Sequence, residues 1–388
     1  MRIRILASLV VLTVVAQVPA LHPGAESVVA ETVHASEVVH AGLATPVVPV
    51  PAATPVVPVG PASRVQIGQP SVYLAFVGDT GTGNDRQRRV RDQLVRVSRA
   101  VPLQSVFLLG DNLYNSGESK HIMPRFVTMY EELMATGTVF HAGLGNHDVK
   151  KCKGAGFVPV PRDHSAYRPA ADCWVAEQLA RPEFGYPNGY RYYSIASGGT
   201  VPLVEVFVLD SNTLSAVQGV AGGPDGSQLD WLRGALSRST AVWKIVAIHH
   251  PIYSPRSDRF LWAGRGADDE MRDLLEPIFV DRVDVVFQGH NHMYARLEPR
   301  NGVRYFVAGG GGQKPYKFRP DAMTIARSDG GKFNHFVVVR VTDEVFEYCV
   351  IDDSGATRDG GWFRHGDAVD TGFTEGSCPS LEAPSDES

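Results

Sequence analysis

The sequence predicts an α/β fold, because short apolar runs typical of buried strands alternate with amphipathic segments typical of helices. Strands of the main body are predicted at residues 72–77, 106–109, 138–144, 242–248 and 283–287. Helices are predicted at residues 85–100, 123–134, 228–236 and 268–279. Each of these strands ends at a turn that carries carboxylate, amide or imidazole groups. In α/β sheets the carboxyl ends of strands are where ligands bind, so this pattern predicts a functional rim.

The other elements follow from local patterns. The helix at residues 85–100 has an apolar face, formed by Val90, Leu94 and Val97. Residues 190–196 and 202–209 predict a β-hairpin that ends at Asp210, which we interpret as a turn carboxylate. Further strands are predicted at residues 303–307, around Val337 and at 345–351, and the glycines at 309–312 are interpreted as a tight turn.

The chain is predicted to consist of four segments: a signal peptide at residues 1–20, a Pro/Val-rich linker at 21–70, a catalytic domain at 71–365 and a polar C-terminal tail at 366–388. The first segment has Arg2 and Arg4 before an apolar run and small residues around Ala20, as secretory signals have. An uncleaved membrane anchor is the alternative, but the apolar run is shorter than the ~20 residues that a spanning helix needs. We therefore expect export to the periplasm or the extracellular space, with no membrane partner after cleavage.

The linker repeats the six residues Thr-Pro-Val-Val-Pro-Val, at positions 45–50 and 54–59. A Pro-Val repeat without an alternating polar face favours extended polyproline II structure over a packed core. The repeat is therefore interpreted as a spacer.

The net charge of -5 argues against nucleic acid as a stable partner, because such proteins normally present a basic face. The oligomeric state stays open. Four cysteines suit an oxidising compartment. Of the three possible pairings we favour Cys152 with Cys173 and Cys349 with Cys378, since each closes a local loop.

Five predicted strand ends carry residue types that commonly bind metal ions. These are Asp79, Asp111 with Tyr114, Asn146 with His147 and Asp148, His249 with His250, and His290 with His292. Hard oxygen ligands and imidazoles that converge from separate strands are what a pair of divalent or trivalent metal ions requires. The glycines around Asp79 are interpreted as allowing its close approach to a metal.

The tetrad at residues 145–148 combines a ligand with candidate catalytic groups. The amide oxygen of Asn146 is a hard, neutral ligand. His147 is placed to reach a substrate oxygen, and Asp148 is expected to hold the His147 ring. Asn146 and His250 are the expected substrate contacts.

Two histidine pairs have different geometries. Adjacent side chains on an extended segment point to opposite sides, so only one of His249 and His250 should bind metal. We choose His249. In the His-x-His arrangement, His290 and His292 share a side and can bind one metal or two neighbouring ones.

The insertion at residues 149–190 carries several basic residues and two of the cysteines. Long loops of this kind are either functional lids or surface loops that are tied down. A basic lid over an anionic substrate and a disulfide-clamped structural loop are both open interpretations.

Taken together, the motifs resemble the calcineurin-like metallophosphoesterases, and Tyr114 narrows the resemblance to the purple acid phosphatases. Because residues 21–70 are too short and too poor in strands for an N-terminal sandwich domain, the chain resembles the small, single-domain kind. The motifs are Gly78-Asp79-x-Gly81, Gly110-Asp111-x-x-Tyr114, Gly145-Asn146-His147-Asp148, His249-x-Pro251 and Gly289-His290-x-His292. The resemblance covers about residues 71–352. Thr80 stands where the family often has tryptophan, and Ile248 replaces a common glycine.

The resemblance implies a four-layer α/β/β/α sandwich of two mixed sheets flanked by helices. It also implies two metal positions. The first is usually ferric iron, held by Asp79, Asp111, Tyr114 and His292. The second is iron, zinc or manganese, held by Asp111, Asn146, His249 and His290.

This resemblance implies hydrolysis of small-molecule phosphomonoesters by a metal-bound hydroxide, with His147 as acid for the leaving group or as a clamp on phosphate. A phosphodiesterase or nucleotide hydrolase would use the same ligands and is the alternative enzyme. A ligand-binding protein that keeps the metals without turnover is the alternative from another class.

Overall fold

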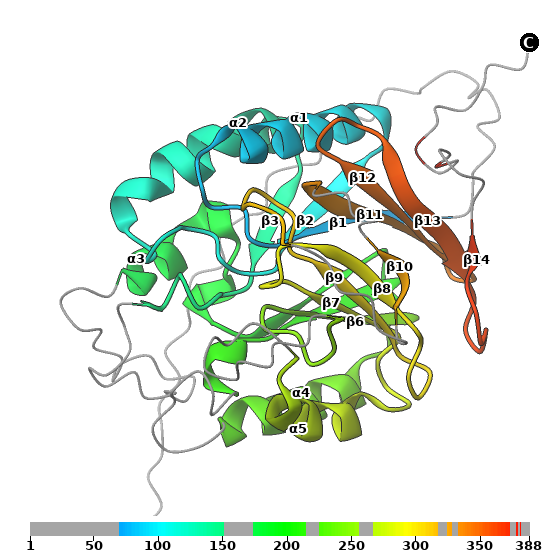
Figure 1. Ribbon diagram of the computed structural model, residues 1–388. Coiled ribbons are helices and arrows are strands. Elements are labelled where there is room, and N and C mark those ends of the chain that lie inside the picture. Colours follow the sequence, from blue (N-terminus) through cyan, green and yellow to red (C-terminus); the bar gives the residue numbers. More distant parts are fainter. Residues whose placement is uncertain are drawn as a thin grey trace, which may run out of the picture. The chain divides into compact units, whose positions relative to one another are not determined.

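The computed structural model describes residues 70–150, 174–214, 225–255, 267–316, 324–327 and 333–372, together with Cys378 and Leu381. These residues build two β-sheets that lie face to face between helices (Figure 1). In this part of the chain, no helix is both long enough and apolar enough to cross a membrane.

The first sheet has seven strands in the order β14-β13-β12-β11-β1-β2-β3 within the described residues. Strands β1, β2 and β3 are parallel to one another, and the strands from β11 to β14 add antiparallel pairs. The strands are β1 (Val72–Val77), β2 (Leu103–Leu108), β3 (Val139–Ala142), β11 (His335–Val341), β12 (Phe346–Asp352), β13 (Thr357–Phe363) and β14 (Thr371–Gly372).

The second sheet has the order β10-β8-β9-β7-β6-β5-β4. Strands β5, β6, β7 and β9 are parallel, while β4, β8 and β10 pair antiparallel with their neighbours. The strands are β4 (Tyr193–Ser197), β5 (Val204–Val208), β6 (Trp243–Ile248), β7 (Val285–Gln288), β8 (Tyr294–Leu297), β9 (Arg304–Ala308) and β10 (Thr324–Arg327).

Helices cover the outer faces of both sheets. Figure 1 shows α1 and α2 above the first sheet, and α4 and α5 below the second. The α-helices are α1 (Asp85–Ala100), α2 (Thr128–Ala135), α3 (Val175–Ala180), α4 (Gly226–Arg238) and α5 (Asp269–Phe279). Shorter helical turns are η1 (Ser119–His121), η2 (Met123–Val127), η5 (Pro182–Phe184), η6 (Pro187–Gly189) and η7 (Ser211–Thr213).

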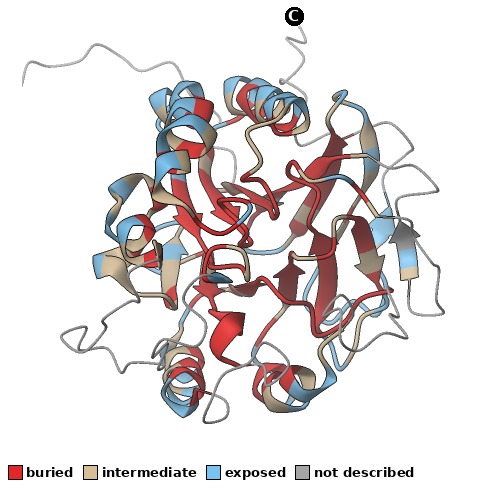
Figure 2. Cartoon of the chain, turned by 60° about the vertical axis from the view of Figure 1, so that its left-hand side comes forward, coloured by how far each residue is buried: buried red, intermediate tan, exposed pale blue. Residues whose placement is uncertain are grey.

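The main core lies between the two sheets. The Phe76 ring of β1 stacks on the Phe287 ring of β7 with centroids 3.9 Å apart, and both side chains are buried. Figure 2 shows the strands buried at the centre and the helices exposed on their outer faces. The predicted sandwich of two mixed sheets flanked by helices is therefore confirmed.

Several predicted elements differ in detail. The helix expected at residues 123–134 begins with the π-helical turn η2 and continues as α2. The insertion at 149–190 contains α3, η5 and η6 in its described part, although the sequence lacks a clear helical period there. Its residues 151–173, with most of the basic side chains and the Cys152–Cys173 pairing, lie outside the described residues.

Residues of the predicted C-terminal tail at 366–388 also make contacts with the fold. Strand β14 pairs with β13. The Asp370 carboxylate lies 2.6 Å from Nε of Arg304, and both side chains are almost completely buried. The predicted disulfide between Cys349 and Cys378 is present, and it ties Cys378 to β12.

The stability of the fold is expected to fall as the pH drops from 6.5 to about 4, because two buried histidines stay neutral in the folded chain. Burial lowers the pKa of His141 and of His335 from 6.5 to about 4. Between these values the unfolded chain binds a proton at each histidine and the folded chain does not, so acid favours unfolding. The lowered pKa of each histidine reduces the free energy of unfolding by roughly 3 kcal/mol at acid pH.

We therefore expect His141→Gln to flatten the pH dependence of the free energy of unfolding, measured by urea denaturation at several pH values. The double variant with His335→Gln should flatten it further. If the free energy of unfolding depended on pH in both variants as it does in the wild type, the two buried histidines would not be the cause of the acid sensitivity.

Candidate metal centre

The ends of the two sheets meet at one rim. The Gly78 N–H, just after β1, donates to the Ala308 carbonyl at the end of β9 over 2.8 Å, and this bond joins the first sheet to the second. The rim therefore receives the turns that follow β1, β2 and β3 from one sheet and those that follow β6 and β7 from the other.

Three of the residues on this rim have a left-handed backbone. The φ angles are 62° at Asp79, 55° at Asp111 and 65° at His290. This conformation is unfavourable for side chains other than glycine, and such strain is typical of functional sites. Gly145 is also constrained, because a Cβ atom at this position would lie 2.2 Å from Oδ1 of Asp111.

Three ligand atoms form the first group on the rim. The Tyr114 phenol oxygen lies 2.9 Å from Oδ1 of Asp79 and 3.2 Å from Nε2 of His292, and this nitrogen lies 3.2 Å from the same Asp79 oxygen. Ligand atoms at right angles around an ion, each about 2.1 Å from it, are about 3.0 Å apart. The three atoms therefore fit one ion.

A second group lies beside the first. The Asn146 Oδ1 atom is 3.1 Å from Nε2 of His249 and 3.0 Å from Nδ1 of His290. Nε2 of His249 is 3.4 Å from Oδ1 of Asp111. These separations fit a second ion by the same criterion.

Asp111 lies between the two groups. Ligand atoms of Asp79, Asp111 and His249 all lie within 4.8 Å of one another. Burial acts to raise the pKa of Asp111, but the charges on His249, His147 and His290 outweigh it and lower that pKa. Asp111 is thus the residue that would contact both ions if two were bound.

The rim concentrates buried negative charge. Asp79 and Asp111 are almost completely buried. Burial first, and then the charges of Asp111 and Asp79, raise the pKa of the Tyr114 phenol well above its ordinary value of 10.0. Burial acts to lower the pKa of His249, yet the same two carboxylates outweigh it and raise that pKa. A bound cation would compensate this charge.

Outer hydrogen bonds orient the ligands. Nδ1 of His249 lies 2.7 Å from the Leu109 carbonyl and donates to it, so Nε2 is the nitrogen directed at Asn146 and Asp111. A ring contact of this kind fixes the tautomer and the ring orientation of a metal-binding histidine. The His290 backbone N–H donates to Oδ2 of Asp79 over 2.8 Å, and this bond orients the Asp79 carboxylate.

The structure assigns Asp148 a role other than the expected one. Its Oδ1 accepts the Leu113 N–H at 3.0 Å, and its Oδ2 accepts the N–H groups of Gly145 at 2.8 Å and Asn112 at 3.2 Å. The His147 ring is held by the Asn115 carbonyl, 2.6 Å from Nδ1. Asp148 therefore joins the turns after β2 and β3, and the expectation that it holds the His147 ring is corrected.

Sequence adjacency explains this error. Asp148 follows His147 directly, but Asp148 is buried while His147 is partly exposed against the Tyr114 ring, with centroids 4.5 Å apart. Burial and the neighbouring Asp111 raise the pKa of Asp148 to about 7, and the Gly145 and Asn112 N–H groups act against this rise.

The side chains of His249 and His250 were expected to point to opposite sides of the segment, but the His250 ring lies near the rim. The His250 ring is 4.8 Å from the ring of His249 and 4.8 Å from that of His290, between centroids. Asp210, by contrast, caps η7 and pairs with Arg191, as a turn carboxylate does.

Sequence reasoning missed the support that the glycine run provides. The Gly311 N–H donates to the Gly78 carbonyl at 2.8 Å, and the Gln313 N–H donates to the Asp79 carbonyl at 3.2 Å. A Cβ atom at Gly311 would lie 2.5 Å from the Gly78 oxygen, so only glycine permits this approach. Four consecutive glycines, one residue after the predicted strand at 303–307, were the available signal.

Arg125 was also missed. Its guanidinium donates to the Tyr114 carbonyl and lies 3.5 Å from the Gly81 carbonyl. It therefore connects the turns that carry Tyr114 and Asp79. No motif marks this arginine, which comes from the π-helical turn η2.

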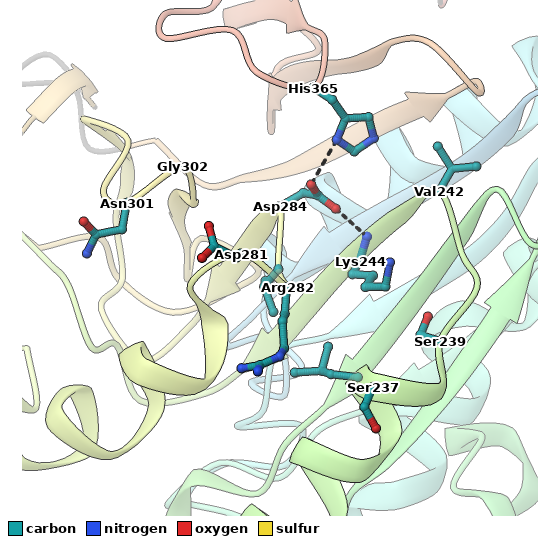
Figure 3. Close-up of a pocket in the computed structure, with 12 residues that line it drawn as sticks. Ser237, Ser239, Val242, Lys244, Asp281, Arg282, Asp284, Asn301, Gly302 and His365 are labelled. Atoms are coloured by element: carbon teal, nitrogen blue, oxygen red, sulfur yellow. Dashed lines mark hydrogen bonds and ion pairs between the residues drawn. The ribbon is translucent and has the colours of Figure 1, made fainter.

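A pocket of about 500 Å³ lies away from the metal centre, where β6 and β7 begin. In Figure 3, Asp284 lies between Lys244 and His365. Its carboxylate accepts the Lys244 backbone N–H at 2.7 Å and lies 3.2 Å from Nδ1 of His365. The pocket contains none of the predicted site residues.

Comparisons with known proteins agree with this geometry. Residues 72–294 match the family model described as calcineurin-like phosphoesterase. Among curated proteins, the chain is similar to purple acid phosphatase 4 of Arabidopsis thaliana, with 24% identity over 74% of this chain and 81% of the relative. It is also similar to purple acid phosphatase 17 of the same plant, with 24% identity over 66% of this chain and 72% of the relative.

A comparison with solved structures finds the same fold in another protein. The structure titled "GAP50 the anchor in the inner membrane complex of Plasmodium" has a TM-score of 0.60 and 15% identity, covering 77% of this chain and 90% of that one. The family model spans more than half of the 388 residues, and the curated relatives confirm the resemblance that Tyr114 indicated. The chain therefore belongs to the calcineurin-like phosphoesterases and, within them, resembles the purple acid phosphatases.

Proposed function

We propose that the protein is an exported, binuclear metal-dependent phosphatase that hydrolyses phosphomonoesters. The observation that carries the proposal is the pair of adjacent ligand groups with Asp111 between them. Two ions held in this way would lower the pKa of a bound water and neutralise the phosphoryl oxygens of a substrate. Export rests on the signal-like residues 1–20, which lie outside the described residues.

The chemistry of the donors supports ferric iron in the first position. There Asp79, Asp111, Tyr114 and His292 would bind. The pKa of Tyr114 is raised by burial and by two carboxylates, so its phenol loses a proton only to a strongly acidic cation. The second position, with Asp111, Asn146, His249 and His290, has one carboxylate, one amide and two imidazoles, which suit iron, zinc or manganese.

His147 is proposed as the group that protonates the leaving oxygen or clamps the phosphate. Its Nδ1 is engaged by the Asn115 carbonyl, so Nε2 is the nitrogen available to a substrate. The ring is partly exposed at the edge of the buried ligands, where a substrate would approach. Asn146 and His250 are the other residues proposed to contact substrate.

We expect His147→Ala to lower kcat by about 100-fold or more for a monoester with a poor leaving group, and much less for one with a good leaving group. A poor leaving group needs a proton in the transition state, whereas a nitrophenolate does not. Steady-state kinetics on an alkyl phosphate and on a nitrophenyl phosphate measure the difference. Full turnover on both substrates would exclude the acid role.

A substrate panel tests the proposed function itself. The metal-replete protein should hydrolyse monoesters faster than diesters and nucleotides across several pH values, and removal of the metals with a chelator should abolish the activity. Preferential cleavage of diesters would replace the monoesterase with a phosphodiesterase. Absence of hydrolysis in metal-replete protein would overturn the enzyme proposal.

A further inference from the structure

Three histidines, not two, meet at the second metal position. Ring nitrogens of His249, His250 and His290 all lie within 4.8 Å of one another. The side chains of His249 and His250 are almost completely buried, so an approaching ligand does not need to strip water from an exposed ring. The rings lie edge to face or tilted, so they do not stack on one another.

The Ser211 hydroxyl holds the His250 ring through its Nδ1 atom. The Ser211 hydroxyl oxygen accepts the His250 backbone N–H at 3.1 Å and lies 2.8 Å from the His250 Nδ1 atom. When Nδ1–H donates to this oxygen, the lone pair of His250 resides on Nε2. His249 is arranged in the same way, with Nδ1 anchored on the Leu109 carbonyl and Nε2 directed at the ligands.

We propose that His250 is an additional imidazole donor to the second metal position, held in the metal-binding tautomer by Ser211. The proposal deepens the proposed binuclear function and rests on it. It revises the expectation that only one of the two adjacent histidines binds metal, and it replaces the substrate contact expected of His250.

A third imidazole changes which ion the position prefers. With His249, His250 and His290, nitrogen donors outnumber the oxygens of Asp111 and Asn146. Imidazole suits zinc and ferrous iron, whereas carboxylate, carbonyl and water oxygens suit manganese. The second position is therefore expected to select zinc or ferrous iron over manganese, and removal of His250 should weaken this preference.

The test is zinc and manganese binding to full-length protein, measured by competition with a chromophoric chelator. His250→Gln should lower zinc affinity about 100-fold and manganese affinity much less, and Ser211→Ala should lower zinc affinity about 10-fold. His141→Gln is the control, since it makes the same change at a buried histidine on β3 that lies against Phe107 and belongs to neither ligand group. Thermal unfolding in chelator checks that each variant folds.

A second readout reports coordination directly. Cobalt(II) bound in the second position should give a visible d–d spectrum that changes in His250→Gln and stays the same in His141→Gln. Unchanged zinc affinity and an unchanged cobalt spectrum in a folded His250→Gln protein would overturn the proposal, whether or not activity falls. If activity alone falls, His250 contacts substrate and does not bind metal. If wild-type protein binds neither ion, the binuclear function itself has failed.

Discussion

Asp111→Asn is expected to lower kcat/KM for a phosphomonoester by about 1,000-fold or more and to reduce the metal content of the protein at both positions. Asp111 is the residue that lies between the two ligand groups, and its carboxylate is buried there beside His249. The amide cannot carry the negative charge that two adjacent cations need. Elemental analysis and steady-state kinetics on the purified protein measure the two effects.

The matched control for this prediction is Asp230→Asn. Asp230 is also an aspartate, but its side chain is 82% exposed in a surface pair with Arg233 on α4. This variant should keep wild-type metal content and turnover. An Asp111→Asn protein that retains two ions per chain would show that Asp111 does not bridge them.

Asp370→Ala is expected to lower the free energy of unfolding by about 3–5 kcal/mol, because it leaves the buried Arg304 without the carboxylate that balances its charge. Asp370 accepts from Arg304 at 2.6 Å and from the Tyr348 phenol at 3.1 Å, and it lies 3.5 Å from Arg296. These contacts join β8 and β9 of the second sheet to β12 of the first. Urea denaturation in the presence of a chelator measures the loss without a contribution from metal binding.

Asp230→Ala serves as the comparison, because removing one partner of an exposed ion pair costs less than about 1 kcal/mol. If Asp370→Ala were as stable as Asp230→Ala, the contacts of Asp370 with Arg304, Arg296 and Tyr348 would not stabilise the fold.

The part of the fold that sequence reasoning predicted is the part with long apolar runs. Strand β1 was predicted at the residues where it lies, since Val72–Val77 is apolar throughout and is buried on both sides. Strand β13 was not predicted, because Thr357–Phe363 contains two adjacent glycines and lacks apolar alternation. This segment forms a strand because its backbone pairs antiparallel with β12, an interaction that the local sequence pattern does not predict.

The candidate ligand residues could be proposed from the sequence because each belongs to a short motif at a strand end. Their supporting partners could not, because these come from distant parts of the chain. Ser211 lies 39 residues from His250, and the Leu109 carbonyl lies 140 residues from His249. Asp148 illustrates the same limitation. Its neighbour in sequence is His147, but its carboxylate accepts hydrogen bonds from the backbone of Leu113, Gly145 and Asn112.

The visible absorption spectrum of the purified, metal-replete protein tests the central claim most directly. Tyr114 bound to ferric iron should give a violet to pink charge-transfer band, with two metal ions per chain by elemental analysis. Tyr114→Phe should lose the band and keep a folded protein, because the phenol oxygen is the only atom removed. A colourless protein with iron in both positions, or a band that persists in Tyr114→Phe, would contradict a centre in which Tyr114 binds iron.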